Sequence, residues 1–197
     1  MPLMQARHYA SLALTCAVLV YAAPAVAQYG ALDGEWRFYG GDGGHTQYTG
    51  LDQIDAQNVG DLQVAWRWRA ENSSDRPLFN LESTPIMIGG VLYTTAGASE
   101  VAAIDAATGE TLWLYTPPPR TNGEGEVGAP PTGSGRGVAY WTDGEQERLF
   151  HNISDARLVA LDAKTGEPVA DFGENGYVDL ARDLVKPGAR VRCISTP

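Results

Sequence analysis

A glycine-rich stretch at residues 123–128, with the sequence GEGEVG, has the G-x-G-x-x-G spacing of a dinucleotide-binding loop. In such a loop the glycines follow a strand and open a helix, whose amino terminus binds the pyrophosphate. Here proline clusters flank the stretch at 117–119 and 130–131, and glutamates occupy positions where the anionic ligand would lie. The sequence therefore argues against dinucleotide binding, and it predicts a long loop over 117–135 instead.

The histidine and cysteine residues give little support for a metal site or for thiol chemistry. His45 and His151 stand alone, without the spacing of metal ligands, and we expect each to be a surface or packing histidine. Cys193 is the one cysteine after residue 27, so no disulfide forms within that part of the chain. The excess of 24 acidic over 14 basic residues argues against binding to nucleic acid, whose phosphates require clustered lysine and arginine.

The first 27 residues have the features of a secretory signal peptide rather than of a folded domain. A basic start precedes an apolar run, and the run ends in the small-x-small cleavage sequence AVA at 25–27. The alternative, a membrane anchor, needs a longer apolar run than this one, which Pro24 also interrupts. We therefore expect export to the periplasm and a mature domain over 28–197.

Three stretches of the sequence are similar to one another, which indicates a repeat architecture. AIDAATGETLW at 103–113 is the clearest copy, ALDAKTGEPVA at 160–170 lacks only the tryptophan, and IDAQNVGDLQVAW at 54–66 needs an insertion to align. The successive Ile-Asp or Leu-Asp pairs are 50 and 57 residues apart. This period fits a four-stranded propeller blade and is longer than an ankyrin or tetratricopeptide repeat.

The residues between these copies predict short strands and tight turns. Runs rich in Val, Ile, Tyr and Thr lie at 84–88 and 91–96, with Gly89-Gly90 between them as a hairpin turn. No stretch after residue 27 shows apolar residues at helical spacing over a dozen positions. The pattern therefore predicts an all-β meander.

The motif around Asp105 predicts a tight turn followed by a tryptophan clamp. The Asp105 carboxylate and the Thr108 hydroxyl can each bind backbone N–H groups, and Gly109 can adopt the left-handed conformation. Trp113 on the outgoing strand would pack on a neighbouring unit, and full burial would stabilise the seam by at most about 4–6 kcal/mol. An ordinary hairpin with a core tryptophan is the alternative, and the second copy favours the clamp.

The pattern A-x-D-x-x-T-G-x-x-x-W is similar to the tryptophan-docking motif of the quinoprotein dehydrogenases, which use pyrroloquinoline quinone (PQQ). Four further segments are similar to parts of the same family: 36–66, 81–95, 136–141 and 171–180. The last of them, 171–180, resembles a loop of the sugar and polyol branch of the family.

The resemblance implies an eight-bladed propeller with the quinone stacked on its axis. This chain would be an amino-terminal fragment that forms the first two to three blades, with its repeats clearest at 81–117 and 136–173. Ala170 stands where the motif has tryptophan, so the contact between blades is expected to be weaker there.

By the same resemblance, Glu82 hydrogen-bonds the quinone and Arg136 is the cation beside the quinone oxygens. An arginine fork can hold a dicarboxylate or an ortho-quinone at two points, and its charge stabilises the reduced ring. The alternatives are a solvated strand end for Glu82 and a surface ion pair for Arg136.

Other positions depart from the family pattern or fall outside it. The alcohol dehydrogenase branch has adjacent cysteines before the arginine, whereas this chain has Ser134-Gly135. The catalytic aspartate and the calcium ligands are expected beyond residue 197. Ser195 or Thr196 is a candidate hydroxyl contact to the quinone and stays unassigned.

The implied reaction removes hydride from an alcohol, sugar or polyol carbon to a quinone carbonyl, with calcium as Lewis acid and an aspartate as general base. A cytochrome or a membrane quinone is the implied electron acceptor. We expect the 197 residues alone to be inactive and prone to aggregation, since two or three blades leave strand edges open. The alternatives are a non-enzymatic propeller scaffold of the outer-membrane assembly type and a truncated gene product.

Overall fold

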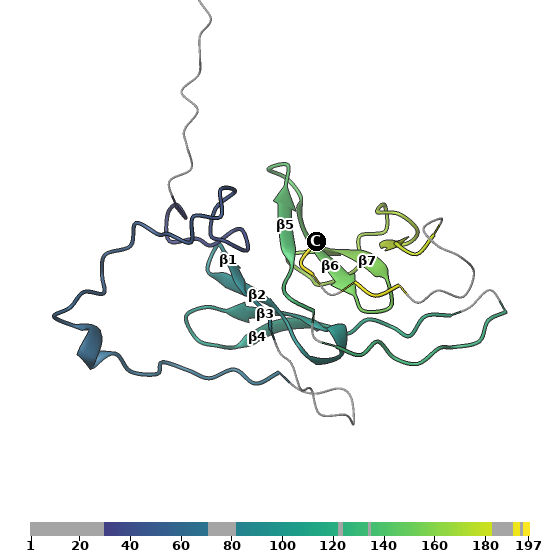
Figure 1. Ribbon diagram of the computed structural model, residues 1–197, viewed down its shortest axis with the longest axis horizontal. Coiled ribbons are helices and arrows are strands. Elements are labelled where there is room, and N and C mark those ends of the chain that lie inside the picture. The colour runs from purple at the N-terminus through teal and green to yellow at the C-terminus, as the bar shows by residue number, and fades with distance from the viewer. Residues whose placement is uncertain (1–29, 71–81, 122–123, 134, 183–190, 194) are drawn as a thin grey trace, which may run out of the picture.

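The computed structural model describes residues 30–70, 82–121, 124–133, 135–182, 191–193 and 195–197. The expected signal peptide at 1–27 lies outside these residues. The described chain forms two four-stranded antiparallel sheets, each with its strands in sequence order (Figure 1). Helical structure in the described part is limited to the short 3-10 turns Val59–Asp61 and Gly97–Ser99. The prediction of an all-β fold built from propeller blades is confirmed.

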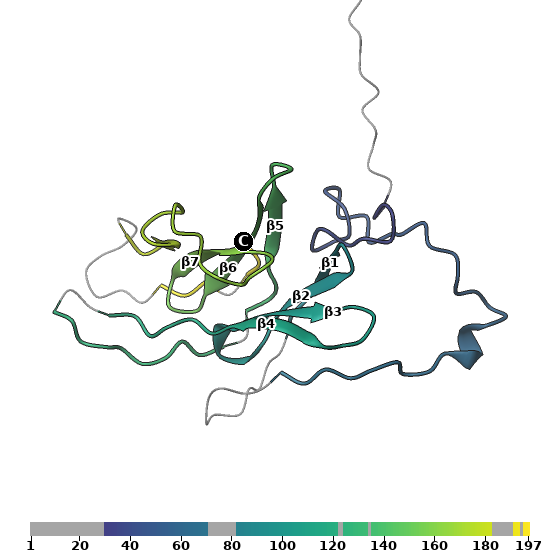
Figure 2. The same ribbon diagram turned by 180° about the vertical axis from the view of Figure 1, so that it is seen from behind.

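Each sheet is a meander that we call a blade. Blade 1 contains β1 (Ile86–Ile88), β2 (Val91–Thr95), β3 (Val101–Asp105) and β4 (Thr111–Tyr115). Blade 2 contains β5 (Ala139–Thr142), β6 (Glu147–Ile153), β7 (Arg157–Asp162) and β8 (Tyr177–Asp179). Between β4 and β5 the chain extends away from both sheets before it returns, which is the expected long loop (Figure 2).

The first hairpin follows from alternating burial and a glycine turn. Ile86 and Ile88 are buried and Met87 between them is half-buried, as a period of two requires. Gly89 and Gly90 have φ values of 58° and 80°, which only glycine adopts without strain, and they reverse the chain.

The turn of blade 1 has the predicted hydrogen bonds. Asp105 Oδ1 accepts from the N–H of Ala107 at 2.9 Å, the N–H of Thr108 at 2.8 Å and the Thr108 hydroxyl at 2.9 Å. The Thr108 hydroxyl accepts from the N–H of Glu110 at 3.2 Å, and Gly109 has a φ of 76°. The Thr108 hydrogen bonds and the Ala107 N–H lower the pKa of Asp105, because they stabilise its charged form.

Blade 2 repeats this turn at Asp162. Its Oδ1 accepts from the N–H groups of Lys164 and Thr165, both at 2.9 Å, and from the Thr165 hydroxyl at 3.2 Å. The Thr165 hydroxyl accepts from the N–H of Glu167 at 3.2 Å, and Gly166 has a φ of 75°. The two turns are therefore the same structure, built from the same residue types.

The third copy, at 54–66, forms a turn without a blade. Asp55 Oδ1 again accepts from backbone N–H groups, those of Gln57 at 2.8 Å and Asn58 at 3.0 Å. Val59 stands where the other copies have glycine, and a β-branched residue cannot take the left-handed conformation that returns the chain. The chain continues instead into the 3-10 turn, and residues 62–70 belong to no strand.

Trp113 joins the two blades. Its Nε1 donates to the backbone oxygen of Ala163 at 3.1 Å, and the Tyr93 hydroxyl donates to the same oxygen at 3.2 Å. The indole lies directly on Gly166, where an added Cβ would sit 2.5 Å from the ring. The predicted clamp over the neighbouring turn is confirmed, and it requires glycine at its contact point.

Trp66 makes the equivalent contact on the turn of blade 1. Its Nε1 donates to the backbone oxygen of Ala106 at 3.1 Å, and a Cβ on Gly109 would lie 2.6 Å from the indole. The 62–70 segment therefore occupies, relative to blade 1, the position that β4 occupies relative to blade 2.

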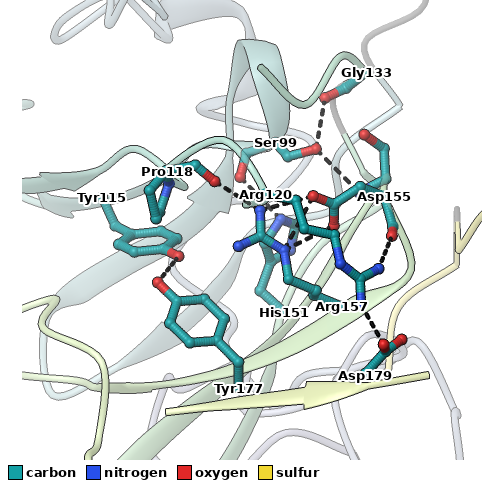
Figure 3. Close-up of polar contacts among 11 residues, drawn as sticks. Ser99, Tyr115, Pro118, Arg120, Gly133, His151, Asp155, Arg157, Tyr177 and Asp179 are labelled. Atoms are coloured by element: carbon teal, nitrogen blue, oxygen red, sulfur yellow. Dashed lines mark hydrogen bonds and ion pairs between the residues drawn. The ribbon is translucent and has the colours of Figure 1, made fainter. Parts of the chain in front are cut away.

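A second set of contacts ties the blades together through polar side chains (Figure 3). The hydroxyls of Tyr115 and Tyr177 lie 2.9 Å apart. Arg157 pairs with Asp155 at 2.7 Å and donates to the backbone oxygen of Pro118, also at 2.7 Å. These contacts fix the start of the long loop on blade 2.

The outer part of blade 2 differs from that of blade 1. After the turn, the N–H of Val169 donates a hydrogen bond to the backbone oxygen of Ala160 at 2.8 Å, and the chain then leaves the sheet. It rejoins as β8, where Val178 pairs with Leu158. Ala170, which stands in place of the motif tryptophan, lies in the detour and is exposed.

The amino-terminal segment is organised around a buried aspartate. Asp42 is 2% exposed, and its carboxylate accepts from the N–H groups of Gly30, Gly44 and Thr46 and from the Thr46 hydroxyl at 2.8–3.0 Å. These bonds, those from Thr46 foremost, lower its pKa by stabilising the carboxylate. Trp36 shares two backbone hydrogen bonds of 2.9 Å with Met87, which attaches the segment to β1.

The core lies between the blades and is formed by apolar residues of the strands that face one another. Its fully buried side chains include Ile86, Val101, Leu149, Ile153, Val159 and Leu161. In the part of the chain that the structure describes, no helix has the length and apolar character needed to cross a membrane.

Candidate functional site

Glu82 and Arg136 form an ion pair, although 54 positions separate them in the sequence. The Arg136 guanidinium and the Glu82 carboxylate lie 2.9 Å apart, and their side chains are 53% and 58% exposed. Glu82 lies four residues before β1, and Arg136 lies three residues before β5. The fold therefore places the two predicted cofactor-binding residues side by side, in the exposed ion pair that was the alternative prediction for Arg136.

The backbone around Arg136 is held against blade 1. The N–H of Thr84 donates to the backbone oxygen of Arg136 at 3.2 Å, and the Thr196 hydroxyl approaches the same oxygen at 3.4 Å. An added Cβ on Gly137 would lie 2.9 Å from the oxygen of Thr84, so glycine is needed for this approach. These contacts fix the backbone of Arg136, from which its side chain extends.

The segment that carries Glu82 is fixed by hydroxyl groups. The Ser83 hydroxyl lies 2.8 Å from the hydroxyls of both Thr94 and Thr95, and it accepts from the Thr95 N–H at 3.1 Å. The backbone is therefore ordered on both sides of the ion pair. The two charged side chains themselves remain accessible to a ligand.

A hollow of about 440 Å³ opens beside Arg136. Its walls combine aromatic rings, a second arginine and hydroxyl groups, and they come from three parts of the chain. The lining includes Arg37, Phe38, Tyr39, Arg136, Tyr140, Ser195 and Thr196.

This set of donors fits an anionic, planar ligand. The guanidinium can bind carboxylate or quinone oxygens at two points, hydroxyls can donate further hydrogen bonds, and aromatic rings can stack on a flat ring system. PQQ, a tricarboxylated ortho-quinone, has these properties. Because the ion pair is half-exposed, exchanging the Glu82 carboxylate for a ligand oxygen costs little stability.

The structure also locates the other residues that the sequence singled out. His45 is exposed, and it lines the hollow beside Arg136 together with Ser195 and Thr196. Cys193 is half-buried and has no disulfide partner among the described residues. Within the same residues, no group of three or more His, Cys, Asp or Glu side chains could hold a metal ion.

His151 is a fully buried packing histidine, one of the two predictions made for it, whereas the buried Glu100 was not singled out from the sequence. His151 Nδ1 and Glu100 Oε2 are buried without a hydrogen-bond partner in the described structure. Asp42 was likewise missed as the organiser of the amino-terminal segment. No local signal marks these groups, because only the packing of distant segments buries them.

Comparison with known proteins decides the family. Residues 36–197 match the PQQ family model described as glucose/ethanol/alcohol dehydrogenase, beta-propeller domain. The chain belongs to this family of quinoprotein dehydrogenases. The resemblance inferred from the tryptophan-docking motif is thereby confirmed.

Two quinoprotein relatives illustrate the similarity. The dehydrogenase subunit of the quinone alcohol dehydrogenase of Gluconobacter oxydans is 39% identical over 140 residues, which cover 71% of this chain and 17% of the relative. A 1-butanol dehydrogenase (cytochrome c) of Thauera butanivorans is 36% identical over 189 residues, or 95% of this chain and 24% of the relative. The chain thus spans about a fifth of the length of the quinoproteins that it matches.

A solved structure shows the same fold. The quinohemoprotein alcohol dehydrogenase of Comamonas testosteroni superposes with a TM-score of 0.57 at 30% identity, over 76% of this chain and 20% of that protein. The two blades described here are therefore part of a quinoprotein propeller.

Proposed function

We propose that this chain forms part of the cofactor wall of a PQQ-dependent dehydrogenase that oxidises an alcohol, sugar or polyol. The observation that carries the proposal is the ion pair of Glu82 and Arg136, which joins the two expected quinone contacts beside a hollow lined with aromatic rings and hydroxyls. Family membership gives the class of reaction.

Bound PQQ would supply the electron sink that accepts the hydride. In this proposal the Arg136 guanidinium donates to the oxygens of the quinone, and its charge stabilises the negative charge that develops there. Glu82 accepts a hydrogen bond from the ligand and keeps the arginine in place. Tyr39 and Tyr140 line the hollow, and their rings would pack against the flat ligand.

Several parts of the proposal extend beyond the described residues. A calcium ion as Lewis acid and an aspartate as general base complete the implied site. Export by the segment 1–27 would place the protein in the periplasm, where a cytochrome or a membrane quinone accepts the electrons. We also infer that the 197 residues are inactive as a dehydrogenase by themselves, because the relatives they match are several times longer.

Equilibrium titration with PQQ tests the assignment. Absorbance of the quinone, measured against increasing full chain, should show saturable binding that Arg136→Ala weakens about tenfold, equivalent to roughly 1.4 kcal/mol of binding free energy. Arg182→Ala is the matched control, because Arg182 is also an exposed, ion-paired arginine but pairs with Glu174 on the outer side of blade 2.

Two outcomes would contradict the proposal: no saturable binding of PQQ, or equal affinities of the wild type and the Arg136→Ala variant. A purely structural propeller, the alternative function, predicts the first of these outcomes.

A further inference from the structure

His151 lies at the seam between the blades, beneath the segment that carries Arg136. It is fully buried in β6, on the face that packs against blade 1. Its Nε2 lies 3.0 Å from the backbone oxygen of Ser99. Because a carbonyl oxygen only accepts, Nε2 carries the proton and donates, which leaves Nδ1 unprotonated.

Ser99 also forms hydrogen bonds to the loop before β5 (Figure 3). Its N–H and its hydroxyl both donate to the backbone oxygen of Gly133, at 2.5 and 3.2 Å. The Ser99 hydroxyl also accepts from the N–H of Ser154 at 3.3 Å. Hydrogen bonds therefore connect the imidazole through Ser99 to Gly133.

The imidazole ring also contacts this segment directly. Gly135 has a φ of 65°, and an added Cβ there would lie 2.9 Å from His151 Cε1. The ring thus contacts the backbone just before Arg136, and glycine at 135 leaves the space that the ring occupies.

The charge state of His151 suits this role. Burial lowers its pKa to about 4, and the nearby backbone groups of Ser99 and Gly137 only partly oppose the shift. The ring is therefore neutral near pH 7, so it does not repel the Arg136 guanidinium.

Strand register shows that Thr94 in blade 1 and His151 in blade 2 occupy corresponding positions, each in contact with a residue next to one of the two charged side chains. In blade 1, Thr94 pairs with Ala102, next to the pair that contains Ala103. In blade 2, His151 pairs with Val159, next to the pair that contains Ala160. The Thr94 hydroxyl holds Ser83, next to Glu82. His151 contacts Gly135, next to Arg136.

We propose that His151 is a positioning residue for Arg136: its ring, fixed by Ser99, holds the backbone of Gly135, next to Arg136, so that the guanidinium meets the carboxylate of Glu82 and the bound quinone. The first part concerns this chain alone, and the second rests on the proposed function. His151 touches neither the ion pair nor the hollow, so it acts through the backbone of its neighbours.

Two measurements on the full chain test this role. Hydrogen exchange of the amides of 136–138 should be at least about tenfold faster in His151→Leu than in the wild type, because an opening of the segment becomes easier. The dissociation constant for PQQ should rise about tenfold in the same variant. His151→Gln retains an N–H donor for Ser99 and should restore most of both properties.

Leu149→Ala is the control for a general loss of stability. Leu149 lies on the same face of β6 and is also fully buried, and its partner across the sheet is Tyr140 rather than a residue next to Arg136. The inference is overturned if His151→Leu leaves exchange of 136–138 within twofold of wild type, or if Leu149→Ala accelerates it equally.

The two levels of the inference are separable. If the wild type does not bind PQQ, the proposed function fails, and hydrogen exchange still decides whether His151 holds the segment. If PQQ binds and depends on Arg136 but not on His151, the proposed function stands and the positioning role is refuted.

Discussion

Blades 1 and 2 share a turn but not the strand that follows it. In blade 1, β4 leaves the turn directly, pairs along β3 and carries Trp113 to the next blade. In blade 2 the corresponding chain pairs briefly, leaves the sheet with Ala170 exposed, and returns only as β8. The turn hydrogen bonds are the same in both.

This difference shows that the turn and the tryptophan clamp are independent devices. The turn needs only local hydrogen bonds from Asp and Thr and a left-handed glycine, so it forms whatever follows. The clamp needs a neighbouring turn with a bare glycine to receive the indole, as Gly166 receives Trp113.

Removing the clamp should have the largest effect on stability. Trp113→Ala removes a half-buried indole, its hydrogen bond to Ala163 and its contact with Tyr93, and it should lower the free energy of unfolding by about 3–4 kcal/mol. Trp113→Phe keeps part of the ring contact and should cost less. Denaturant unfolding measures both, and a loss below 1 kcal/mol for Trp113→Ala would show that the seam does not depend on the indole.

Acid should weaken blade 2 through His151, whose counterpart in blade 1, Thr94, does not titrate. The folded-state pKa of about 4 lies below the usual 6.5, so the unfolded chain binds the proton first. Stability is therefore complete above pH 6.5 and decreases as the pH falls toward 4, by about 3 kcal/mol in total. The difference in unfolding free energy between wild type and His151→Gln should show this dependence, and parallel pH profiles of the two proteins would refute it.

Substitutions at two glycines distinguish the destabilisation caused by backbone strain from that caused by steric contact. Gly166→Ala places a methyl group against the Trp113 ring, whereas Gly89→Ala, also at positive φ, meets no atom within 4 Å. We expect losses of about 2–3 kcal/mol for the first and about 1 kcal/mol for the second. Thermal unfolding of the two variants measures the losses of stability. Equal losses would mean that the Trp113 indole can move away from the added methyl group without destabilising the protein.

Restoring the missing tryptophan should have the smallest effect. Ala170→Trp adds an indole at an exposed position in the detour, where no described turn is placed to receive it. Its unfolding free energy should stay within about 0.5 kcal/mol of wild type. A gain above 1 kcal/mol would indicate that the tryptophan alone can create a clamp.

Sequence reasoning succeeded where the structure is local. Asp105, Thr108 and Gly109 lie within five positions, so their hydrogen bonds follow from the chain itself. At 54–66, the copy that needs an insertion to align, the turn at Asp55 forms, but the chain continues into a 3-10 turn and no strand follows. The pairing of Glu82 with Arg136 was not predicted as a contact, because 54 positions, which include all of blade 1, separate them in the sequence.

The sequence by itself determined the strands, the tight turns and the repeat, since each depends on residues that are neighbours along the chain. Only the tertiary structure decided which turn receives Trp113, how Asp42 and His151 become buried, and that Glu82 and Arg136 meet. The physical reason is that burial and long-range contact depend on how one blade packs on the next, and no residue type at a single position specifies that packing.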